Sequence, residues 1–192
     1  QQIAWDAVSA ALNVVNFRFS VVATDYLSLG QDPSPFLHFW SLAVEEQFYA
    51  LWPAIVAISA GVLLVTKRSS SRKTVVWVFG AIAVCSLAAS VWLTKVNQPW
   101  AFFMLPTRAW QLACAGMIAL FPEALERIGG RLKDLLVVAG LVLIGLAAVI
   151  LNDSTEFPGW VAVLPVLGAG LVIAGSRRSL EGVAALLGSR PM

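Results

Sequence analysis

The chain has 192 residues, of which 59% are hydrophobic and only 12% charged, and its mean hydropathy is +0.80. A soluble domain carries about a quarter charged residues. This composition therefore excludes an ordinary water-soluble domain and predicts a partner in the lipid bilayer. The net charge of +2 comes from short basic clusters between apolar runs, which predicts no nucleic-acid partner. Cys85 and Cys114 lie inside apolar runs, where structural thiols are expected rather than a disulfide or a metal site.

Apolar segments follow one another along the whole chain. They are continuously apolar, whereas the strands of a membrane β-barrel alternate apolar and polar residues. An open sheet cannot satisfy its backbone in lipid. The sequence therefore predicts an all-α, polytopic transmembrane helix bundle with about six spans, the last two near the short end of the usual 17–25 residues. The predicted spans are residues 3–26, 37–65, 75–96, 102–121, 135–151 and 160–175.

Basic residues gather in alternate connections between these segments. The positive-inside rule places that side in the cytoplasm, so that the first segment enters from the cytoplasm and both ends of the chain lie there. The chain begins at Gln1 without a signal peptide and ends at Met192, and both ends are expected to be cuts through a longer protein. The basic residues of the three connections are Lys67, Arg68, Arg72, Lys73, Arg127, Arg131, Lys133, Arg177, Arg178 and Arg190.

Two features predict local geometry inside the spans. Pro53 and Pro165 should kink their helices. Ala81, Cys85 and Ala89 form a stripe of small residues at four-residue spacing, which favours close helix contact.

Residues 34–49 place an unusual density of polar groups at the start of the second segment. Glu45 lies about 12 Å from the outer end, and Arg18 and Arg108, in other segments, lie at about 12 and 9 Å. Unpaired charges are costly at such depth. We therefore expect Glu45 and Glu46 to pair with Arg108, or with Arg18 as the second candidate, around a polar cavity.

Each polar residue of this layer also has a structural interpretation. The glutamates are either part of a functional site or a buried ion pair that fixes helix packing. Gln47, Ser41 and Asn16 are expected to bridge helices or line the cavity rather than react. His38, near the outer end of its helix, is an interfacial hydrogen bonder or a group in the chemistry.

The run Ser34-Pro35-Phe36-Leu37-His38-Phe39-Trp40-Ser41-Leu42-Ala43-Val44-Glu45-Glu46-Gln47-Phe48-Tyr49, followed by Leu51-Trp52-Pro53, resembles the signature of the bacterial membrane acyltransferase-3 family, the O-antigen acetylase type. The run from Asn16 to Tyr26 is also similar to this family. So is Arg108-Ala109-Trp110-Gln111-Leu112, where Gln111 stands in place of the family's usual glutamate. The remaining segments match only in hydropathy and spacing.

The resemblance implies about ten transmembrane helices, of which residues 1–192, a partial membrane acyltransferase domain, cover roughly helices three to eight. It implies an enzyme of the bacterial cytoplasmic membrane that moves an acyl group, usually acetyl, from acyl-CoA to a hydroxyl of a cell-envelope glycan or glycolipid. No bound cofactor or metal is implied, and the family's catalytic histidine would lie upstream. Supporting catalytic roles then fall to Glu45, Glu46, Arg108 and His38, and substrate binding to Trp40, Ser41, Gln47, Tyr49, Asn16 and Arg18.

A different class of function stays open from the residues alone. A transporter or a non-catalytic structural segment can also carry buried charges along a path. Broken helices in inverted repeats would favour transport, whereas a histidine ten residues after an upstream basic residue would favour the enzyme.

Overall fold

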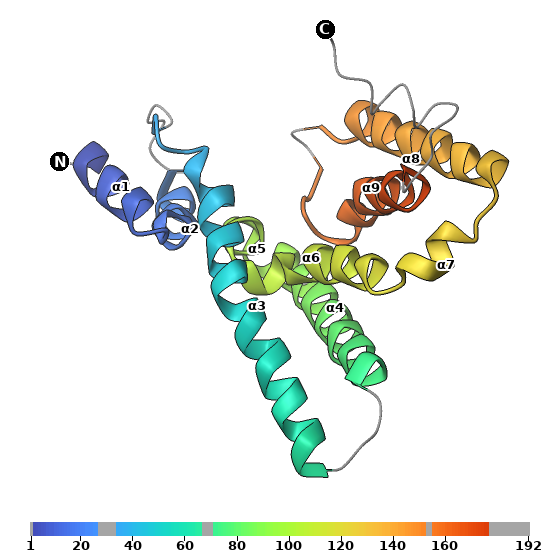
Figure 1. Ribbon diagram of the computed structural model, residues 1–192. Helices are drawn as coiled ribbons and strands as arrows, with labels where there is room; N and C mark the ends of the chain where they lie inside the picture. Colours follow the sequence, from blue (N-terminus) through green and yellow to red (C-terminus); the bar gives the residue numbers. More distant parts are fainter. Residues whose placement is uncertain (1, 27–33, 67–70, 153–154, 177–192) are drawn as a thin grey trace, which may run out of the picture. The chain divides into compact units, whose positions relative to one another are not determined.

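A computed structural model describes residues 2–26, 34–66, 71–152 and 155–176 (Figure 1). Every regular element in these ranges is helical, which confirms the all-α prediction. The elements are α1 (Gln2–Ala11), α2 (Val15–Tyr26), α3 (Phe39–Thr66), α4 (Ser71–Val96), α5 (Gln98–Phe103), α6 (Leu105–Ala119), α7 (Pro122–Glu126), α8 (Gly130–Ile150), the 3-10 turn η1 (Trp160–Ala162) and α9 (Val163–Ser176).

The chain divides into two compact units. The first contains residues up to 110 together with 156–160, and the second contains residues 111–155 together with those from 161 onward. The boundary falls inside α6, directly after Trp110. Each unit is described here by itself.

The first predicted span is not one continuous helix. It breaks between α1 and α2 at residues 12–14, where Asn13 has a φ of 54°. Asparagine tolerates this left-handed conformation better than most residues. The chain therefore turns at Asn13, and a hydropathy pattern alone does not register such a turn.

Helices α3 and α4 are the longest helices of the first unit (Figure 1). Helix α3 contains Pro53. They meet through Trp52 and Phe79, whose rings lie edge to face with centroids 3.9 Å apart. Phe79 is 2% exposed, so this pair belongs to the interior of the unit. Aromatic pairs in this geometry add to the stability that burial provides.

The buried side of α4 differs from the predicted one. Ala81 and Cys85 are exposed, whereas Ser86, Ser90 and Thr94 are buried at the same four-residue spacing. The prediction of a small-residue contact stripe is therefore wrong for this part of α4. The hydroxyls of Ser86 and Thr94 give the physical reason, because they bond backbone groups of other segments.

The fourth predicted span is also interrupted. Helix α5 begins after Asn97, whose side chain accepts a bond from the backbone N–H of Trp100, and it ends at Met104 in an extended conformation. Pro106 then occupies the first turn of α6, where its missing N–H costs nothing. Around these helices, Ala10, Val15, Phe19, Ala43 and Phe103 form a buried apolar cluster.

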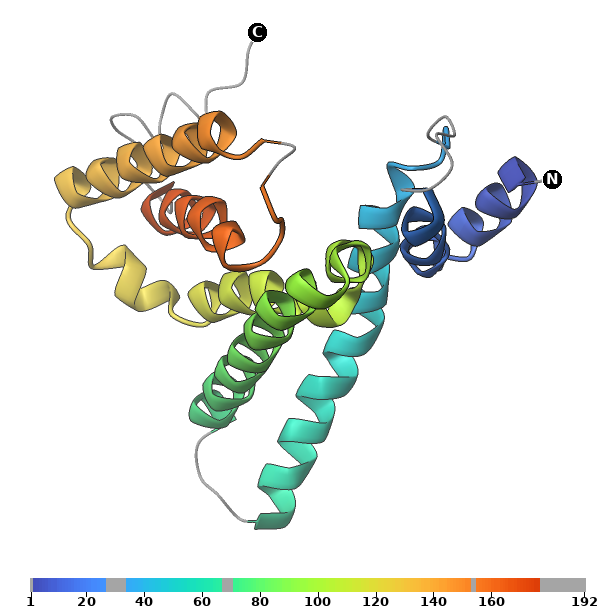
Figure 2. The same ribbon diagram turned by 180° about the vertical axis from the view of Figure 1, so that it is seen from behind.

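In the second unit, α8 and α9 pack side by side, as both views show (Figures 1 and 2). Glycines make this contact close. A Cβ on Gly140 would lie 2.5 Å from the carbonyl oxygen of Gly168, and one on Gly175 would lie 2.6 Å from that of Lys133. Small residues allow such backbone approach between apolar helices.

Among the described residues, two helices, 72–96 and 130–150, are long and apolar enough to cross a membrane, and 160–176 is a shorter apolar helix. These confirm membrane-like helices, while about six spans and the cytoplasmic placement of both ends stay predictions. Several charges on which the predicted topology depends lie outside the described residues: Lys67, Arg68, Arg177, Arg178 and Arg190.

Candidate functional site

Asn16 and Gln47 form a polar pair inside the first unit. Asn16, on α2, is fully buried, and Gln47 reaches it from α3. The Gln47 amide nitrogen lies 2.8 Å from both the Asn16 side-chain oxygen and the Asn13 carbonyl oxygen. The Asn16 amide donates to the Phe103 carbonyl at 3.2 Å and lies 3.4 Å from the Gln47 side-chain oxygen. The pair thus ties α2, α3 and α5 together at the point where the first segment breaks.

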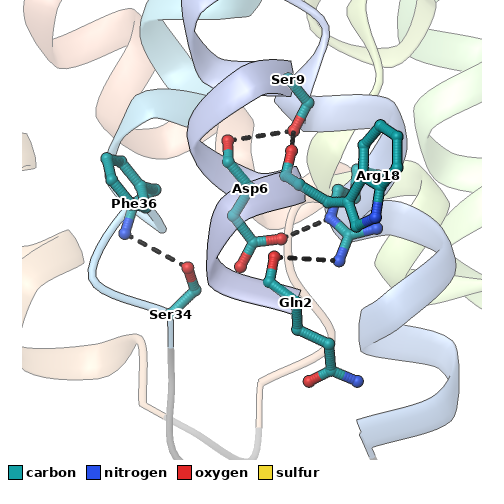
Figure 3. A network of polar contacts seen from close by, with 7 residues as sticks. Gln2, Asp6, Ser9, Arg18, Ser34 and Phe36 are labelled. Carbon is teal, nitrogen blue, oxygen red and sulfur yellow. Dashed lines mark hydrogen bonds and ion pairs between the residues drawn. The ribbon is translucent and has the colours of Figure 1, made fainter.

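Arg18 pairs with Asp6, not with a glutamate of residues 34–49. Figure 3 shows the guanidinium of Arg18 against the Asp6 carboxylate. The Arg18 Nη2 also donates to the Gln2 carbonyl oxygen at 3.5 Å. The Asp6 side chain is 8% exposed and that of Arg18 is 28% exposed. The break at Asn13 brings α1 back beside α2, and this supplies a counter-ion only twelve residues away. The prediction that Arg18 stabilises the glutamates is wrong for this reason.

Arg108 lies among aromatic rings rather than beside a carboxylate. The central carbon of its guanidinium is 4.8 Å from the ring centre of Phe102, 5.0 Å from that of Trp40 and 5.4 Å from that of Phe157. Its Nε donates to the Phe102 carbonyl at 3.0 Å, and its Nη2 is buried without a hydrogen-bond partner among the described residues. Cation–π contacts gain strength when the cation is desolvated.

The predicted pairing of Glu45 and Glu46 with Arg108 is therefore wrong within the described residues. Both glutamates are exposed on α3, together with Ser41 and Tyr49, whereas Ala43 and Val44 are buried. The helical period places successive residues on different faces, and here the apolar pair takes the inward face.

Residues 34–49 are thus divided between two faces. Trp40 and Gln47 point into the unit, where Trp40 lies 4.8 Å from Phe102 and 5.4 Å from Phe103 between ring centres. His38 is exposed in the turn before α3, and its carbonyl is 3.4 Å from the Ser41 hydroxyl. The structure brings Trp40 together with Arg108, and Gln47 together with Asn16. It leaves His38, Ser41, Glu45, Glu46 and Tyr49 on the exposed side.

Buried hydroxyls of α4 and α6 were not predicted. The Ser86 hydroxyl donates to the Pro106 carbonyl at 2.6 Å and accepts from the Trp110 backbone N–H at 2.9 Å. Thr94 accepts from the Gly159 N–H at 3.0 Å. These bonds hold the start of α6, and with it Arg108, against α4. The signal was present as Ser, Ser and Thr at four-residue spacing in an apolar helix.

The fold and the site define a helical chain with membrane-length apolar segments and one unit in which buried polar side chains converge. No family model matches the chain, and no solved structure gives a significant match.

Similarity to curated proteins indicates which class of membrane protein the chain resembles. An uncharacterized protein of Haemophilus influenzae is 24% identical over 156 residues, which make up 77% of this chain and 61% of that protein. The "Putative membrane-bound transacylase BcsY" of Komagataeibacter xylinus is 31% identical over 139 residues, 72% of this chain and 33% of that protein. The peptidoglycan O-acetyltransferase OatA of Listeria monocytogenes is 27% identical over 147 residues, 72% of this chain and 22% of that protein.

These matches confirm the resemblance to bacterial membrane acyltransferases that residues 34–49 indicated, and the relatives' names support an acyltransferase. The chain spans 61% of the length of the Haemophilus relative and a third or less of the other two.

Proposed function

We propose that the chain is part of an integral-membrane O-acyltransferase that moves an acyl group, in the first instance acetyl, from acyl-CoA to a hydroxyl of a cell-envelope glycan or glycolipid. The observation that carries the proposal is the contact between two motif segments. Arg108, from the stretch 108–112, lies against Trp40, from residues 34–49. The relatives named as a transacylase and as an O-acetyltransferase support the same reaction type.

The reaction sets clear demands on the site. The acceptor oxygen attacks the thioester carbonyl, a C–O bond forms and the hydroxyl proton passes to a base. The C–S bond then breaks to release the CoA thiolate, which takes the proton back from the base. Negative charge develops on the carbonyl oxygen, and a preorganised donor stabilises it. We assign this role to Arg108, whose buried Nη2 has no partner in the described part of the chain. The base is a histidine outside residues 1–192, as the resemblance implies.

Glu45, Glu46 and His38 take supporting roles on the exposed side of α3 and of the turn before it. They are available there to further helices of a longer protein or to the acceptor. We place substrate contacts at Trp40, Ser41 and Tyr49, with Asn16, Gln47 and Arg18 holding α1, α2 and α3 together. The whole assembly belongs in the bacterial cytoplasmic membrane, as a multi-pass protein with residues 1 and 192 on the cytoplasmic side.

A transporter is the second candidate, and one observation favours it. Discontinuous helices line the substrate sites of many transporters, and the first predicted span is discontinuous at Asn13. The carbonyl freed by this break is already bonded by Gln47, however. The break therefore has a structural explanation without transport.

The test is ester-linked acetate on the cell envelope, released by mild base, in cells whose chromosomal gene carries Arg108→Ala. Removing an oxyanion donor lowers the rate by about 10²–10³-fold, so ester acetate should fall to background. Lys95→Ala, at an exposed cation, is the matched control and should leave it unchanged. If cells with a folded Arg108→Ala protein carry as much envelope ester acetate as the wild type, Arg108 has no role in the reaction.

A further inference from the structure

An apolar cavity of about 720 Å³ lies in the first unit, and its lining does not include Arg108 or the rings around it. It opens between α2, α3, α4 and the α5–α6 turn. Its apolar and aromatic wall includes Phe17, Leu51, Ala89, Trp92 and Met104. We propose that this cavity binds one hydrocarbon chain of a membrane amphiphile.

The chemistry of the wall excludes a polar ligand. Gln47 and Thr107 supply the only side-chain amide and hydroxyl of the lining. The Gln47 nitrogen is taken up by Asn13 and Asn16, and the Thr107 hydroxyl lies 2.7 Å from the carbonyl oxygens of Ala101 and Met104. A polar ligand would lose its hydration here without replacement bonds, which is costly. A hydrocarbon chain loses none.

The volume distinguishes a hydrocarbon chain from a protein helix. A helix about 10 Å wide that rises 1.5 Å per residue fills roughly 120 Å³ per residue. The cavity would hold about six residues of it, whereas a membrane-spanning helix needs about 20. If a methylene group takes about the ~30 Å³ of a water molecule, the same space holds on the order of 20 methylenes. That is the size of one lipid chain.

The position of the cavity also suits a bilayer amphiphile. Ala89 and Leu93 of the lining lie about 5–10 Å from the end of α4 at Val96. Trp92 and Trp100 belong to the wall and are 65% and 39% exposed. Tryptophan is enriched at the level of the lipid headgroups. A chain can therefore enter from the hydrocarbon layer while its headgroup stays at the interface.

The experiment uses the protein in vesicles of phosphatidylethanolamine and phosphatidylglycerol that contain phosphatidylethanolamine with a diazirine midway along one acyl chain. After illumination, labelled peptides are mapped by mass spectrometry. We expect the label to concentrate on cavity residues of α2, α3 and α4. Ala89→Phe should lower the amount of label on these residues at least fivefold. Unlabelled phosphatidylethanolamine in excess should compete.

Ala81→Phe is the matched control, because Ala81 lies on the same helix, is exposed and does not line the cavity. It should leave the labelling pattern unchanged. Ala50→Leu is a milder second filling variant, used if Ala89→Phe lowers the yield of folded protein. Label spread evenly around the helices, or a pattern that neither filling variant changes, would overturn the proposal. Cross-links from the cavity to another protein segment would overturn it as well.

Discussion

The two units solve the problem of helix association in different ways. In the second unit, α8 and α9 approach through Gly140, Gly168 and Gly175, and a Cβ on any of them would meet the other helix at under 3 Å. In the first unit, α2, α3 and α5 are joined by Asn16 and Gln47, and α4 is joined to α6 by Ser86. Close backbone packing and interhelical hydrogen bonds both stabilise helix association in lipid.

This difference indicates which unit carries the functional site. Glycine packing explains the close α8–α9 approach, although the same unit also buries the Lys133 side chain at the start of α8. Polar groups among apolar helices are costly and are found mainly where function requires them. Residues 34–49, Arg108 and the apolar cavity lie in the first unit, which carries the polar pair Asn16–Gln47. The predictions below test this separation by disrupting each kind of contact.

The largest effect is expected from overpacking the glycine contact. Gly140→Leu would force its side chain into the Gly168 carbonyl and Val172, and should lower the free energy of unfolding by about 3 kcal/mol. Gly145→Leu on the same helix meets nothing within 4 Å and should be neutral or slightly stabilising. Denaturation in detergent, followed by circular dichroism, measures both. Equal losses would mean that α8 and α9 do not pack at Gly140.

Disrupting the ion pair of the first unit should cost somewhat less. Asp6→Ala leaves the charge of Arg18 without its partner, but that side chain is 28% exposed. We therefore expect a loss of about 2 kcal/mol, below the 3–5 typical of fully buried pairs. Asp6→Ala combined with Arg18→Leu should recover part of the loss. Strictly additive losses in this double-mutant cycle would show that the two side chains do not interact.

The Asn16–Gln47 pair should show a smaller loss. Gln47→Leu leaves the side-chain oxygen of buried Asn16 and the Asn13 carbonyl without their donor, which should cost about 1–2 kcal/mol. Tyr49→Phe, at an exposed position on the same helix, is the control. Thermal unfolding in detergent compares the two variants. A Gln47→Leu protein as stable as the control would mean that the amide pair does not hold α2 to α3.

The sequence predicted the helical class and the two motif segments, because hydropathy and residue identity carry that information. It did not predict the break at Asn13, since the stretch is apolar on both sides and one asparagine's φ is a local backbone choice. Asp6 was overlooked as a counter-ion because it becomes a neighbour of Arg18 only once that break is made.

The same limit explains the glutamates. Equal depth along two helices predicts proximity only if the right faces point inward, and depth does not fix which face does. Here Ala43 and Val44 take the inward face, and Arg108 finds aromatic rings and a carbonyl instead of a carboxylate. The roles of Glu45, Glu46 and His38 in the reaction stay predictions.

The smallest effect on stability is expected at those glutamates, and it separates a structural from a functional role. Neither carboxylate pairs with Arg18 or Arg108 in the described part of the chain, and both are exposed. Glu45→Gln and Glu46→Gln should therefore change the free energy of unfolding by no more than about 0.5 kcal/mol. If the carboxylates serve acyl transfer, envelope ester acetate should nevertheless fall in at least one variant. Unchanged acetate in both would remove the pair from the reaction, whereas a large stability loss would show that they support the fold after all.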